Sequence, residues 1–399
     1  MESVLSLNAG SSSIKFALFR RDGTELGERI ASGQIEGIGV APHLFATGQG
    51  GSVLVDRQWP DGAGLDHEAL FDELAAWLAE LSQAGTVSLV GHRVVHGGPD
   101  YAAPVVIDDD VLAQLDRLVS LAPLHQPHNL AAIRAMRALA PDIVHVACFD
   151  TAFHHAMPEL ATHFALPRAL HEEGIRRYGF HGLSYEYIAR RLRALDPALA
   201  GGRVIVAHLG NGASMCAMRG GRSCDTTMGF TALDGLMMGT RSGRLDPGVV
   251  LHLLRSKGMS EAEVEALLYK QSGLLGVSGI SSDMRVLSES TAPEAEEAIS
   301  LFVWRAAREA SALMMSLGGL DGLVFTAGIG EHQANVRARI CAALGWAGVV
   351  LDEAANAVHA PLISAPDSAV TVRIIPTDEE RMIALHSFET VRPQEGETQ

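Results

Sequence analysis

The stretch SVLSLNAGSSSIKFALF at residues 3–19 begins with a short apolar run, passes through a turn rich in glycine and serine around Gly10, and continues as a second apolar run that contains Lys15. This pattern predicts a β-hairpin. The stretch RVIVAHLGNGASMCAM at residues 203–218 has the same pattern, with Gly210 in the place of Gly10. The sequence therefore predicts one supersecondary unit that is used twice, once in each half of the chain.

The length and composition of the chain limit its class. A chain of 399 residues predicts two or three domains, and 47% hydrophobic against 20% charged residues predicts globular cores. The formal charge of −16 argues against partners such as nucleic acid or an anionic membrane surface. No apolar stretch approaches the ~20 residues of a membrane span, so we expect a cytoplasmic protein. The four cysteines are far apart, which favours reduced thiols.

Strands alternate with helices along the chain. Asp66 is placed to cap a helix whose apolar residues recur at helical spacing as far as Leu81. Strands are predicted at residues 87–98 and at residues 143–150, each with an apolar run. The pattern restarts after the second of these strands, which indicates an α/β fold with a domain boundary near residue 150.

A third glycine-rich turn lies at residues 325–332, with the sequence FTAGIGEH. It follows an apolar strand, and we expect it to lead into one helix that contains Val336, Ile340 and Leu344, with Gly330 at the helix entry. Glycine turns expose backbone N–H groups, and a helix N-terminus adds a favourable dipole for an anion. Each turn taken alone is also compatible with an ordinary hairpin or loop, because none matches the P-loop pattern.

Eight motifs carry a family resemblance. NAGSSSIKF, RVVHGG, RRYGFHGLSYEYI, AHLGNGAS, DTTMGFTALDGLMMGTRSG, SGISSDMR, FTAGIGE and PTDEE occur in the order seen in acetate kinases, from Asn8 to about Glu380. The resemblance implies a two-domain duplicated actin-like ATPase fold, shared with sugar kinases, heat-shock chaperone ATPases and actin, with an interdomain cleft for ATP. It places the N-terminal domain at residues 1–150, joined by the tail from about 385 to 399, and the C-terminal domain at residues 151–384.

The resemblance also implies the reaction and the partners. Acetate kinases transfer a phosphoryl group reversibly between ATP and acetate, giving ADP and acetyl phosphate. We therefore expect ATP or ADP and acetate or acetyl phosphate as ligands, and a homodimer formed through the C-terminal domain. Mg²⁺, or Mn²⁺ in its place, is implied near Asn8 and Glu379, which offer hard oxygen donors.

Roles for the catalytic residues follow from the resemblance. Arg93 and Arg241 would hold acetate and then neutralise the phosphoryl group, since the guanidinium fork can meet two oxygens at once. His181 would donate to the same group, and Asp150 would orient an arginine or Mg²⁺. From the residues alone, a histidine near Tyr and Phe is by default a core residue, so the role of His181 depends on the resemblance. Asp150 follows a strand, where α/β folds expose functional groups, and its alternative role is a helix cap. The acyl pocket would be built from Val95, Leu124, Phe180 and Ala232, the last standing where the family more often carries Pro.

The nucleotide site implied by the resemblance draws on all three glycine turns. It comprises Lys15, His208, Leu209, Gly210, Asn211, Gly212, Asp283, Met284, Arg285, Gly328, Ile329, Gly330, Glu331 and His332. Phosphoryl transfer needs positive charge at the transferred group, and an acidic chain should therefore carry isolated cations beside its glycine turns. Lys15, Arg93, Arg241 and Arg285 meet that expectation, although each alone could form a surface salt bridge.

Three other functions remain open from the sequence. The 17 histidines raise the possibility of a zinc hydrolase, but HExxH is absent. A non-enzymatic ATP-dependent switch has a related fold but has no evident need for Arg93 and Arg241. A propionate or butyrate kinase would share the same fold and machinery, so fold arguments do not separate it from an acetate kinase.

Overall fold

The computed structural model describes residues 2–10, 13–23, 25–59, 62, 65–81, 85–123 and 125–392. The chain divides into two compact units, Met1–Ala152 with Asp378–Gln399, and Phe153–Thr377. From the sequence we expected these transitions near residues 150 and 385. In the described parts of the chain, no helix combines the length and the apolar character that crossing a membrane requires. The four cysteines are not joined in disulfides.

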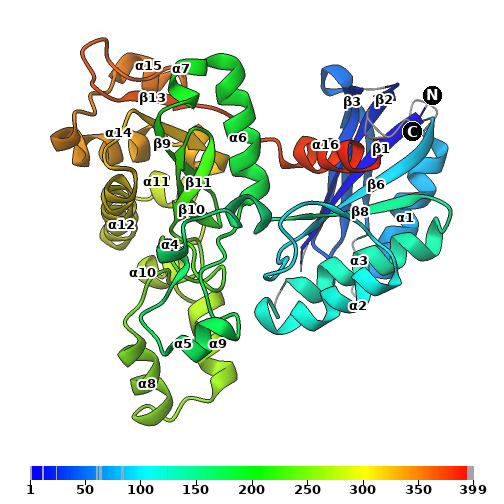
Figure 1. Cartoon of the computed structure of the whole chain (residues 1–399), viewed down its shortest axis with the longest axis horizontal. Helices are drawn as coiled ribbons and strands as arrows, with labels where there is room; N and C mark the ends of the chain where they lie inside the picture. The colour runs from blue at the N-terminus through cyan, green and yellow to red at the C-terminus, as the bar shows by residue number, and fades with distance from the viewer. Residues whose placement is uncertain are drawn as a thin grey trace, which may run out of the picture. The chain divides into compact units, whose positions relative to one another are not determined.

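The first unit is built around one sheet, whose strands β1, β2, β3, β6 and β8 are labelled in Figure 1. The strand order is β5-β4-β3-β2-β1-β6-β8-β7. Its strands are β1 (Glu2–Ala9), β2 (Ser13–Asp22), β3 (Glu25–Glu36), β4 (His43–Gly48), β5 (Val53–Gln58), β6 (Thr86–Val94), β7 (Val105–Val106) and β8 (Val144–Phe149). Its helices are α1 (His67–Glu80), α2 (Asp109–Arg117), α3 (Gln126–Leu139) and α16 (Glu379–Val391), and short 3₁₀ turns lie at Gln49–Gly51 and Leu118–Leu121. A further 3₁₀ turn, Ala152–His154, begins at the last residue of this segment and continues into the second unit.

The predicted N-terminal hairpin is present. β1 and β2 pair antiparallel, with Asn8 opposite Lys15. β1 also pairs parallel with β6, and β6 pairs parallel with β8, so three neighbouring strands end at the same edge of the sheet. β6 ends at Val94, four residues before the end of the predicted strand. The predicted cap is also present, because the Asp66 carboxylate accepts a hydrogen bond of 3.0 Å from the backbone N–H of Ala69.

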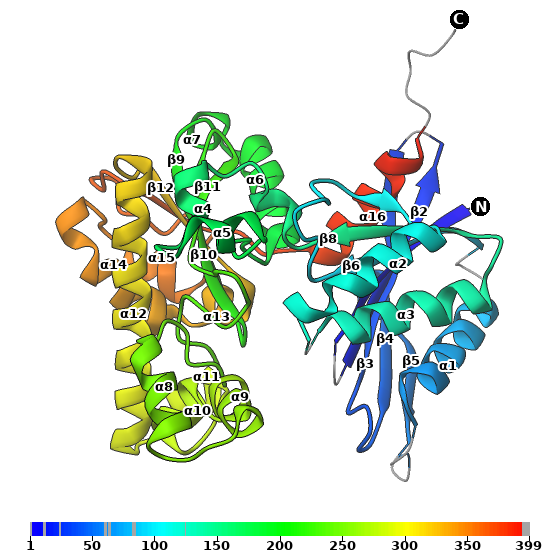
Figure 2. The same cartoon turned by 60° about the horizontal axis from the view of Figure 1, so that its bottom comes forward.

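Helices cover both faces of this sheet. α1 and α3 lie side by side (Figure 2), and their apolar side chains share a core with Val90 of β6. The next residue, Gly91, faces the opposite side, where a Cβ would lie 2.2 Å from Ser387 Oγ and 2.7 Å from Ile383 Cγ2 of α16. Glycine is therefore required for α16 to pack this closely, and the packing brings the N-terminus of α16 to the sheet.

The second unit contains the sheet β11-β10-β9-β12-β13. Its strands are β9 (Arg203–Leu209), β10 (Ala213–Arg219), β11 (Arg222–Thr226), β12 (Gly322–Thr326) and β13 (Thr371–Ile374). Its helices are α4 (Glu159–Thr162), α5 (Arg168–Glu172), α6 (Gly182–Leu195), α7 (Pro197–Ala200), α8 (Pro247–Arg255), α9 (Glu261–Lys270), α10 (Gly273–Ser278), α11 (Met284–Glu289), α12 (Pro293–Leu317), α13 (Ala327–His332), α14 (Ala334–Ala343) and α15 (Glu353–Ala357), with a 3₁₀ turn at Gly345–Ala347.

The second sheet repeats the central pairing of the first. β9 and β10 form an antiparallel hairpin, and β9, β12 and β13 run parallel to one another. The order β10-β9-β12-β13 thus corresponds to β2-β1-β6-β8. The predicted repeat of one supersecondary unit is confirmed. In both units the turn of the hairpin follows the carboxyl end of a strand that has parallel neighbours, which is where α/β folds place functional groups.

The prediction for the segment after β12 was wrong in detail. The chain enters α13 at Ala327, and Val336 and Ile340 belong to a separate helix, α14, while Leu344 lies just beyond its end. Gly330 lies inside α13 without a positive φ, whereas Ala327 has φ of 64°. The residue with the left-handed conformation at the start of α13 is therefore an alanine and not a glycine.

Candidate active site

Three polar side chains of the first unit meet at the ends of its parallel strands. Arg93 lies near the end of β6, Asp150 follows β8, and Asn8 lies near the end of β1. Arg93 donates to Asp150 Oδ2 through Nε at 3.0 Å and through Nη2 at 2.5 Å, and its Nη1 donates to Asn8 Oδ1 at 3.1 Å. The sequence had suggested a helix cap as the alternative role of Asp150, and the structure instead pairs its carboxylate with Arg93.

This cluster is buried and rich in charge. Asp150 is 1% exposed, and its Oδ1 has no hydrogen-bond partner among the described residues. The pKa of Glu379, the first residue of α16, is raised to about 7. Burial is the main cause, the charges of Asp150 and Glu380 act in the same direction, and Arg93 and Lys15 act against it. Burial acts to lower the pKa of Arg93, but the neighbouring carboxylates outweigh this effect and raise it. Carboxyl groups thus outnumber cationic side chains in this cluster, so the cluster can accommodate an additional cation such as a metal ion.

Two other predicted residues of the first unit are described. Lys15 lies on β2 with an exposed side chain, opposite Asn8. Val95 is 3% exposed, and its backbone N–H donates to Asn129 Oδ1 at 3.0 Å. Asn129 Nδ2 in turn donates to the carbonyl of Ala9 at 2.7 Å, so this buried amide ties the end of β1 to the end of β6. Leu124, also predicted for the acyl pocket, lies outside the described residues.

In the second unit, the side chains of His181 and Arg241 converge on the β9–β10 turn. A Cβ at Gly212 would lie 3.3 Å from His181 Nε2 and 3.5 Å from Arg241 Nη2. His181 directly precedes α6 and has φ of 59°, an unusual conformation for a residue with a side chain. A cation and an imidazole beside a turn that carries backbone N–H groups form an arrangement that can hold an anion.

Arg241 is anchored by the loop that carries it. Its Nη1 donates to the carbonyl of Ala232 at 2.8 Å, so two of the predicted site residues are joined directly. The backbone of Thr240 accepts a hydrogen bond of 2.9 Å from Ser272 N–H at the start of α10. Phe180, a predicted acyl-pocket residue, is 2% exposed and directly precedes His181. Hydrogen bonds therefore hold Arg241 and its loop in place, and the buried Phe180 directly precedes His181.

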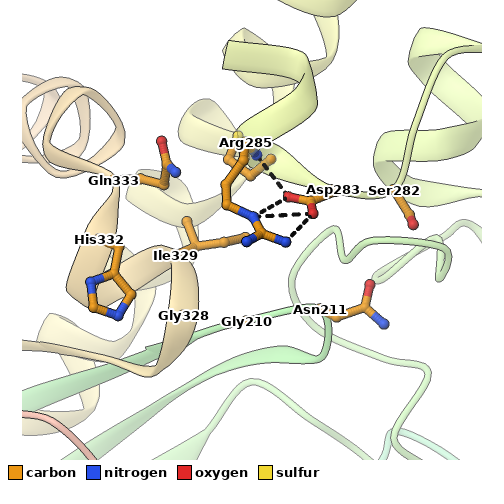
Figure 3. Close-up of a pocket in the computed structure, with 10 residues that line it drawn as sticks. Gly210, Asn211, Ser282, Asp283, Arg285, Gly328, Ile329, His332 and Gln333 are labelled. Atoms are coloured by element: carbon orange, nitrogen blue, oxygen red, sulfur yellow. Dashed lines mark hydrogen bonds and ion pairs between the residues drawn. The ribbon is translucent and has the colours of Figure 1, made fainter. Parts of the chain in front are cut away.

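A cavity of about 380 Å³ lies in the second unit beside the same turn (Figure 3). Its volume is in the range of small-molecule sites. Figure 3 shows the Arg285 side chain next to Ile329 and held by Asp283, with His332 and Gln333 on one side of the pocket. The lining includes eight predicted nucleotide-site residues, namely Gly210, Asn211, Asp283, Met284, Arg285, Gly328, Ile329 and His332, and two that were not predicted, Ser282 and Gln333.

Five predicted nucleotide-site residues of this unit do not line the cavity: His208, Leu209, Gly212, Gly330 and Glu331. The Glu331 carboxylate instead accepts a hydrogen bond of 2.7 Å from the backbone N–H of Ala327 and one of 3.3 Å from Thr377. The fully buried Arg337, which sequence reasoning missed, donates to the carbonyls of Gly330 and Glu331 at 3.0 and 2.9 Å. The side chains of Glu331 and Arg337 therefore hydrogen-bond to the backbone of α13 and do not line the cavity.

One further histidine cluster lies outside this site. Glu159, His163 and His171 each offer a ligand atom within 4.8 Å of the others, and sequence reasoning missed this group. The Nε2 atoms of the two histidines are 2.8 Å apart, but their ring centroids are only 3.6 Å apart. Two imidazoles that share one zinc at ~2.1 Å through Nε2 hold their centroids about 5 Å apart. As they lie, the two rings contact each other and do not converge on one metal ion.

Comparisons with known proteins agree on one family. The sequence profile of the acetokinase family matches residues 3–385. An acetate kinase of Rhodopseudomonas palustris is 56% identical over 387 residues, which are 96% of this chain and 97% of that protein. An acetate kinase of Nitrobacter hamburgensis is 52% identical over 388 residues, which are 97% of this chain and 96% of that protein.

Solved structures show the same likeness. A propionate kinase from Francisella tularensis has a TM-score of 0.91 at 36% identity, with 98% of this chain and 100% of that chain covered. The acetate kinase of Porphyromonas gingivalis has a TM-score of 0.86, also at 36% identity and the same coverage. The predicted fold class, a duplicated α/β fold of the actin-like type, is confirmed by these structures.

Proposed function

The chain belongs to the acetokinase family, and from that membership we infer that it is an enzyme that transfers a phosphoryl group between ATP and acetate. The products are ADP and acetyl phosphate. The relatives at about half sequence identity are acetate kinases, which favours acetate over propionate or butyrate as the acceptor. The observation within the chain that best supports the chemistry is the convergence of His181 and Arg241 on Gly212.

In this proposal the second unit binds the nucleotide. The cavity beside the β9–β10 turn would take the base and ribose, and the N–H groups of the turn would face the phosphates. His181 and Arg241 would then meet the transferred phosphoryl group, whose charge is spread over its equatorial oxygens in the transition state. Arg241 acts by its position and charge and His181 by its position and hydrogen bonding, so neither needs to form a covalent bond.

The first unit would hold the acyl substrate and the metal. Arg93, kept in place by Asp150 and Asn8, would bind the acetate carboxylate, and acetate needs no general base because it is already ionised. Val95 and Leu124 of this unit would contact the methyl group, and Phe180 and Ala232 are the acyl-pocket residues proposed in the second unit. Mg²⁺, or Mn²⁺, fits beside Asn8 and Glu379, because the cluster offers oxygen donors and an unpartnered buried carboxylate oxygen on Asp150. Bound there, the metal would supply charge neutralisation to the phosphates.

We also propose that the enzyme is a cytoplasmic homodimer. Large apolar side chains are exposed on the second unit, among them Trp304 (56%), Met315 (79%) and Trp346 (72%). A second copy of the chain would cover apolar surface of this kind. Sedimentation measurements at several protein concentrations would test the association.

Acetyl phosphate formation tests the reaction directly. Incubation with ATP, Mg²⁺, acetate and hydroxylamine should yield acetyl hydroxamate, and the yield should vanish when EDTA removes the metal. A nucleotide switch that only hydrolyses ATP would yield ADP without hydroxamate. That result would exclude a kinase that acts on acetate.

Gly328 provides the sharpest test of the nucleotide site. A Cβ at Gly328 would meet no atom within 4 Å, and the residue lines the cavity, so the Gly328→Val side chain would fill space meant for the nucleotide. We expect the affinity for ATP and ADP to fall about ten-fold or more in calorimetric titration, with unchanged circular dichroism. Gly345→Val, equally open but away from the cavity, is the control. Equal affinities in both variants would show that this cavity does not bind the nucleotide.

Ala232 is expected to affect the choice of acyl acid. Pro in this position would narrow the acyl pocket, and it would keep the carbonyl that accepts from Arg241. One methylene in an apolar pocket changes binding by about 1 to 3 kcal/mol. Ala232→Pro should therefore lower kcat/KM for propionate more than for acetate at saturating MgATP. An unchanged or higher ratio of propionate to acetate would show that Ala232 has no such role.

A further inference from the structure

A chain of hydrogen bonds leads from the interior of the second unit to His181. The hydroxyl of Tyr185 contacts Ser214 Oγ at very short range, and Ser214 Oγ lies 2.8 Å from His181 Nδ1. Tyr185 and Ser214 are both fully buried. The far side of the same imidazole, Nε2, is the side that faces Gly212 and Arg241. The buried Ser214 hydroxyl, itself in contact with the buried Tyr185 hydroxyl, is thus hydrogen-bonded to Nδ1, the ring nitrogen that points away from Gly212 and Arg241.

The surrounding structure fixes the ring in this position. Tyr185 stands one turn along α6 from His181, and its backbone N–H donates to the His181 carbonyl at 3.0 Å. The His181 ring stacks on His208 with centroids 4.2 Å apart and planes at 18°. Ser214 belongs to β10, the second strand of the hairpin whose turn contains Gly212. Helix, strand and stacking partner therefore define one orientation of the imidazole.

Proton counting favours one direction along the chain. Ser214 has a single hydroxyl proton, so it can donate to Tyr185 or to His181 but not to both. A tyrosine hydroxyl, with a pKa near 10, is a stronger acid than a serine hydroxyl and is the better donor between the two. Tyr185 then donates to Ser214, and Ser214 donates to His181 Nδ1. A neutral imidazole that accepts at Nδ1 carries its proton at Nε2.

We propose that Tyr185 and Ser214 are positioning residues that hold His181 as the neutral Nε2–H tautomer, with this N–H directed at the transferred phosphoryl group. The proposal rests on the role given to His181 in the proposed function. If the hydrogen bonds ran in the opposite direction, with His181 Nδ1–H donating to Ser214, the Nε2 lone pair would face the phosphoryl group and repel it. The hydrogen-bond relay Tyr185–Ser214–His181 therefore makes His181 Nε2 a hydrogen-bond donor beside the positively charged Arg241.

Ser214→Ala and Tyr185→Phe test the relay by kinetics. Each removes one hydroxyl, and loss of such outer hydrogen bonds at other sites commonly costs about 10–100-fold in activity. We expect kcat to fall by this factor, while KM for ATP and for acetate stays within about two-fold of wild type. The reason is that the His181 N–H stabilises charge that develops on the phosphoryl group in the transition state. Ser223→Ala is the matched control, since Ser223 is a buried serine bonded at 2.8 Å to Nδ1 of another histidine, His154. Its kcat should stay within about two-fold of wild type.

A spectroscopic measurement tests the tautomer itself. Imidazole ¹⁵N shifts distinguish a protonated from an unprotonated ring nitrogen, and His181→Gln identifies the signals of His181 among the 17 histidines. Wild type should show the proton at Nε2, and Ser214→Ala should show a mixture of the two tautomers. If Ser214→Ala does not fold, Tyr185→Phe carries the same test, because phenylalanine retains the buried ring.

The outcomes separate the relay from the proposed function. A proton at Nδ1 in wild type overturns the relay, as does normal kcat in both hydroxyl variants when His181→Gln is impaired; the role of His181 then stands without it. Normal kcat in His181→Gln overturns the proposed role of His181 and the relay together. A loss of kcat in Ser223→Ala as large as in Ser214→Ala also overturns the relay, since the effect would then come from any buried Ser–His pair.

Discussion

Arg241→Ala should lower kcat by about 10³-fold while KM for ATP changes little, because a cation that neutralises charge in the transition state contributes mainly to the chemical step. The structure places Arg241 Nη2 beside Gly212 and fixes its other terminal nitrogen on the carbonyl of Ala232. Nη1 of Arg241 therefore binds the loop that carries the residue, and Nη2 faces the β9–β10 turn. Steady-state kinetics at saturating acetate measures the effect.

Arg241→Lys is the informative companion variant. Lysine keeps the charge but has one ammonium in place of the fork, so it cannot serve the Ala232 carbonyl and the phosphoryl group in the same way. We expect a loss of kcat intermediate between those of wild type and alanine. Thermal unfolding of both variants should match wild type, since Arg241 is partly exposed. Near-normal kcat in Arg241→Ala would remove this residue from the chemistry.

The parts of the fold that the sequence predicts well depend on local signals. The two hairpins follow from apolar runs on either side of glycine turns, and the cap at Asp66 needs only the three residues that follow it. The parallel pairing of β1, β6 and β8 then explains why Arg93 and Asp150 meet, although 57 residues separate them. Residues at the ends of neighbouring parallel strands can be expected to share an edge of the sheet.

The segment after β12 shows where local reasoning fails. We expected Gly330 at the helix entry, but α13 begins at Ala327, and the left-handed residue is Ala327. Its N–H is held by the Glu331 carboxylate four residues later, and Arg337 holds the carbonyls at the other end of α13. Arg337 lies outside the turn at residues 325–332, and Glu331 lies inside it but acts on the backbone of Ala327 through its carboxylate. No pattern within the turn itself reports such contacts.

Buried hydrogen bonds between distant segments were also beyond the sequence. Asn129 joins the ends of β1 and β6, and Ser214 joins β10 to His181. Each depends on the packing of a helix on a sheet, and a single serine or asparagine in a sequence of 399 residues gives no sign of its partner. The cavity residues Ser282 and Gln333 were also missed. Ser282 lies inside the motif SGISSDMR and Gln333 directly follows FTAGIGEH, so a motif does not report which side chains in or beside it line a cavity.

Arg93→Met should destabilise the first unit by roughly 3–5 kcal/mol and also abolish activity, because it leaves the Asp150 carboxylate buried without its cation. Asp150 is 1% exposed, and the Arg93 side chain is 16% exposed. The control is Arg134→Met, which breaks an ion pair with Asp116 whose side chains are about half exposed; an exposed pair of this kind contributes about 1 kcal/mol or less. Urea unfolding followed by tryptophan fluorescence measures both variants. Replacing Trp304 and Trp346 by Phe leaves Trp59 and Trp77 as reporters of the first unit.

The double variant Arg93→Met with Asp150→Leu separates stability from chemistry. Replacing both partners of a buried ion pair by apolar residues is often neutral or stabilising, so the free energy of unfolding should return to within about 1 kcal/mol of wild type. Activity should stay absent, because the acetate carboxylate has lost its arginine. Recovered stability would show that the unpaired Asp150 carboxylate causes the destabilisation of Arg93→Met, and absent activity would show that the stable fold without these two side chains is not sufficient for the reaction. If the double variant is as unstable as Arg93→Met, the unpaired carboxylate is not the cause of the destabilisation, and the buried pair does not have the structural role assigned to it.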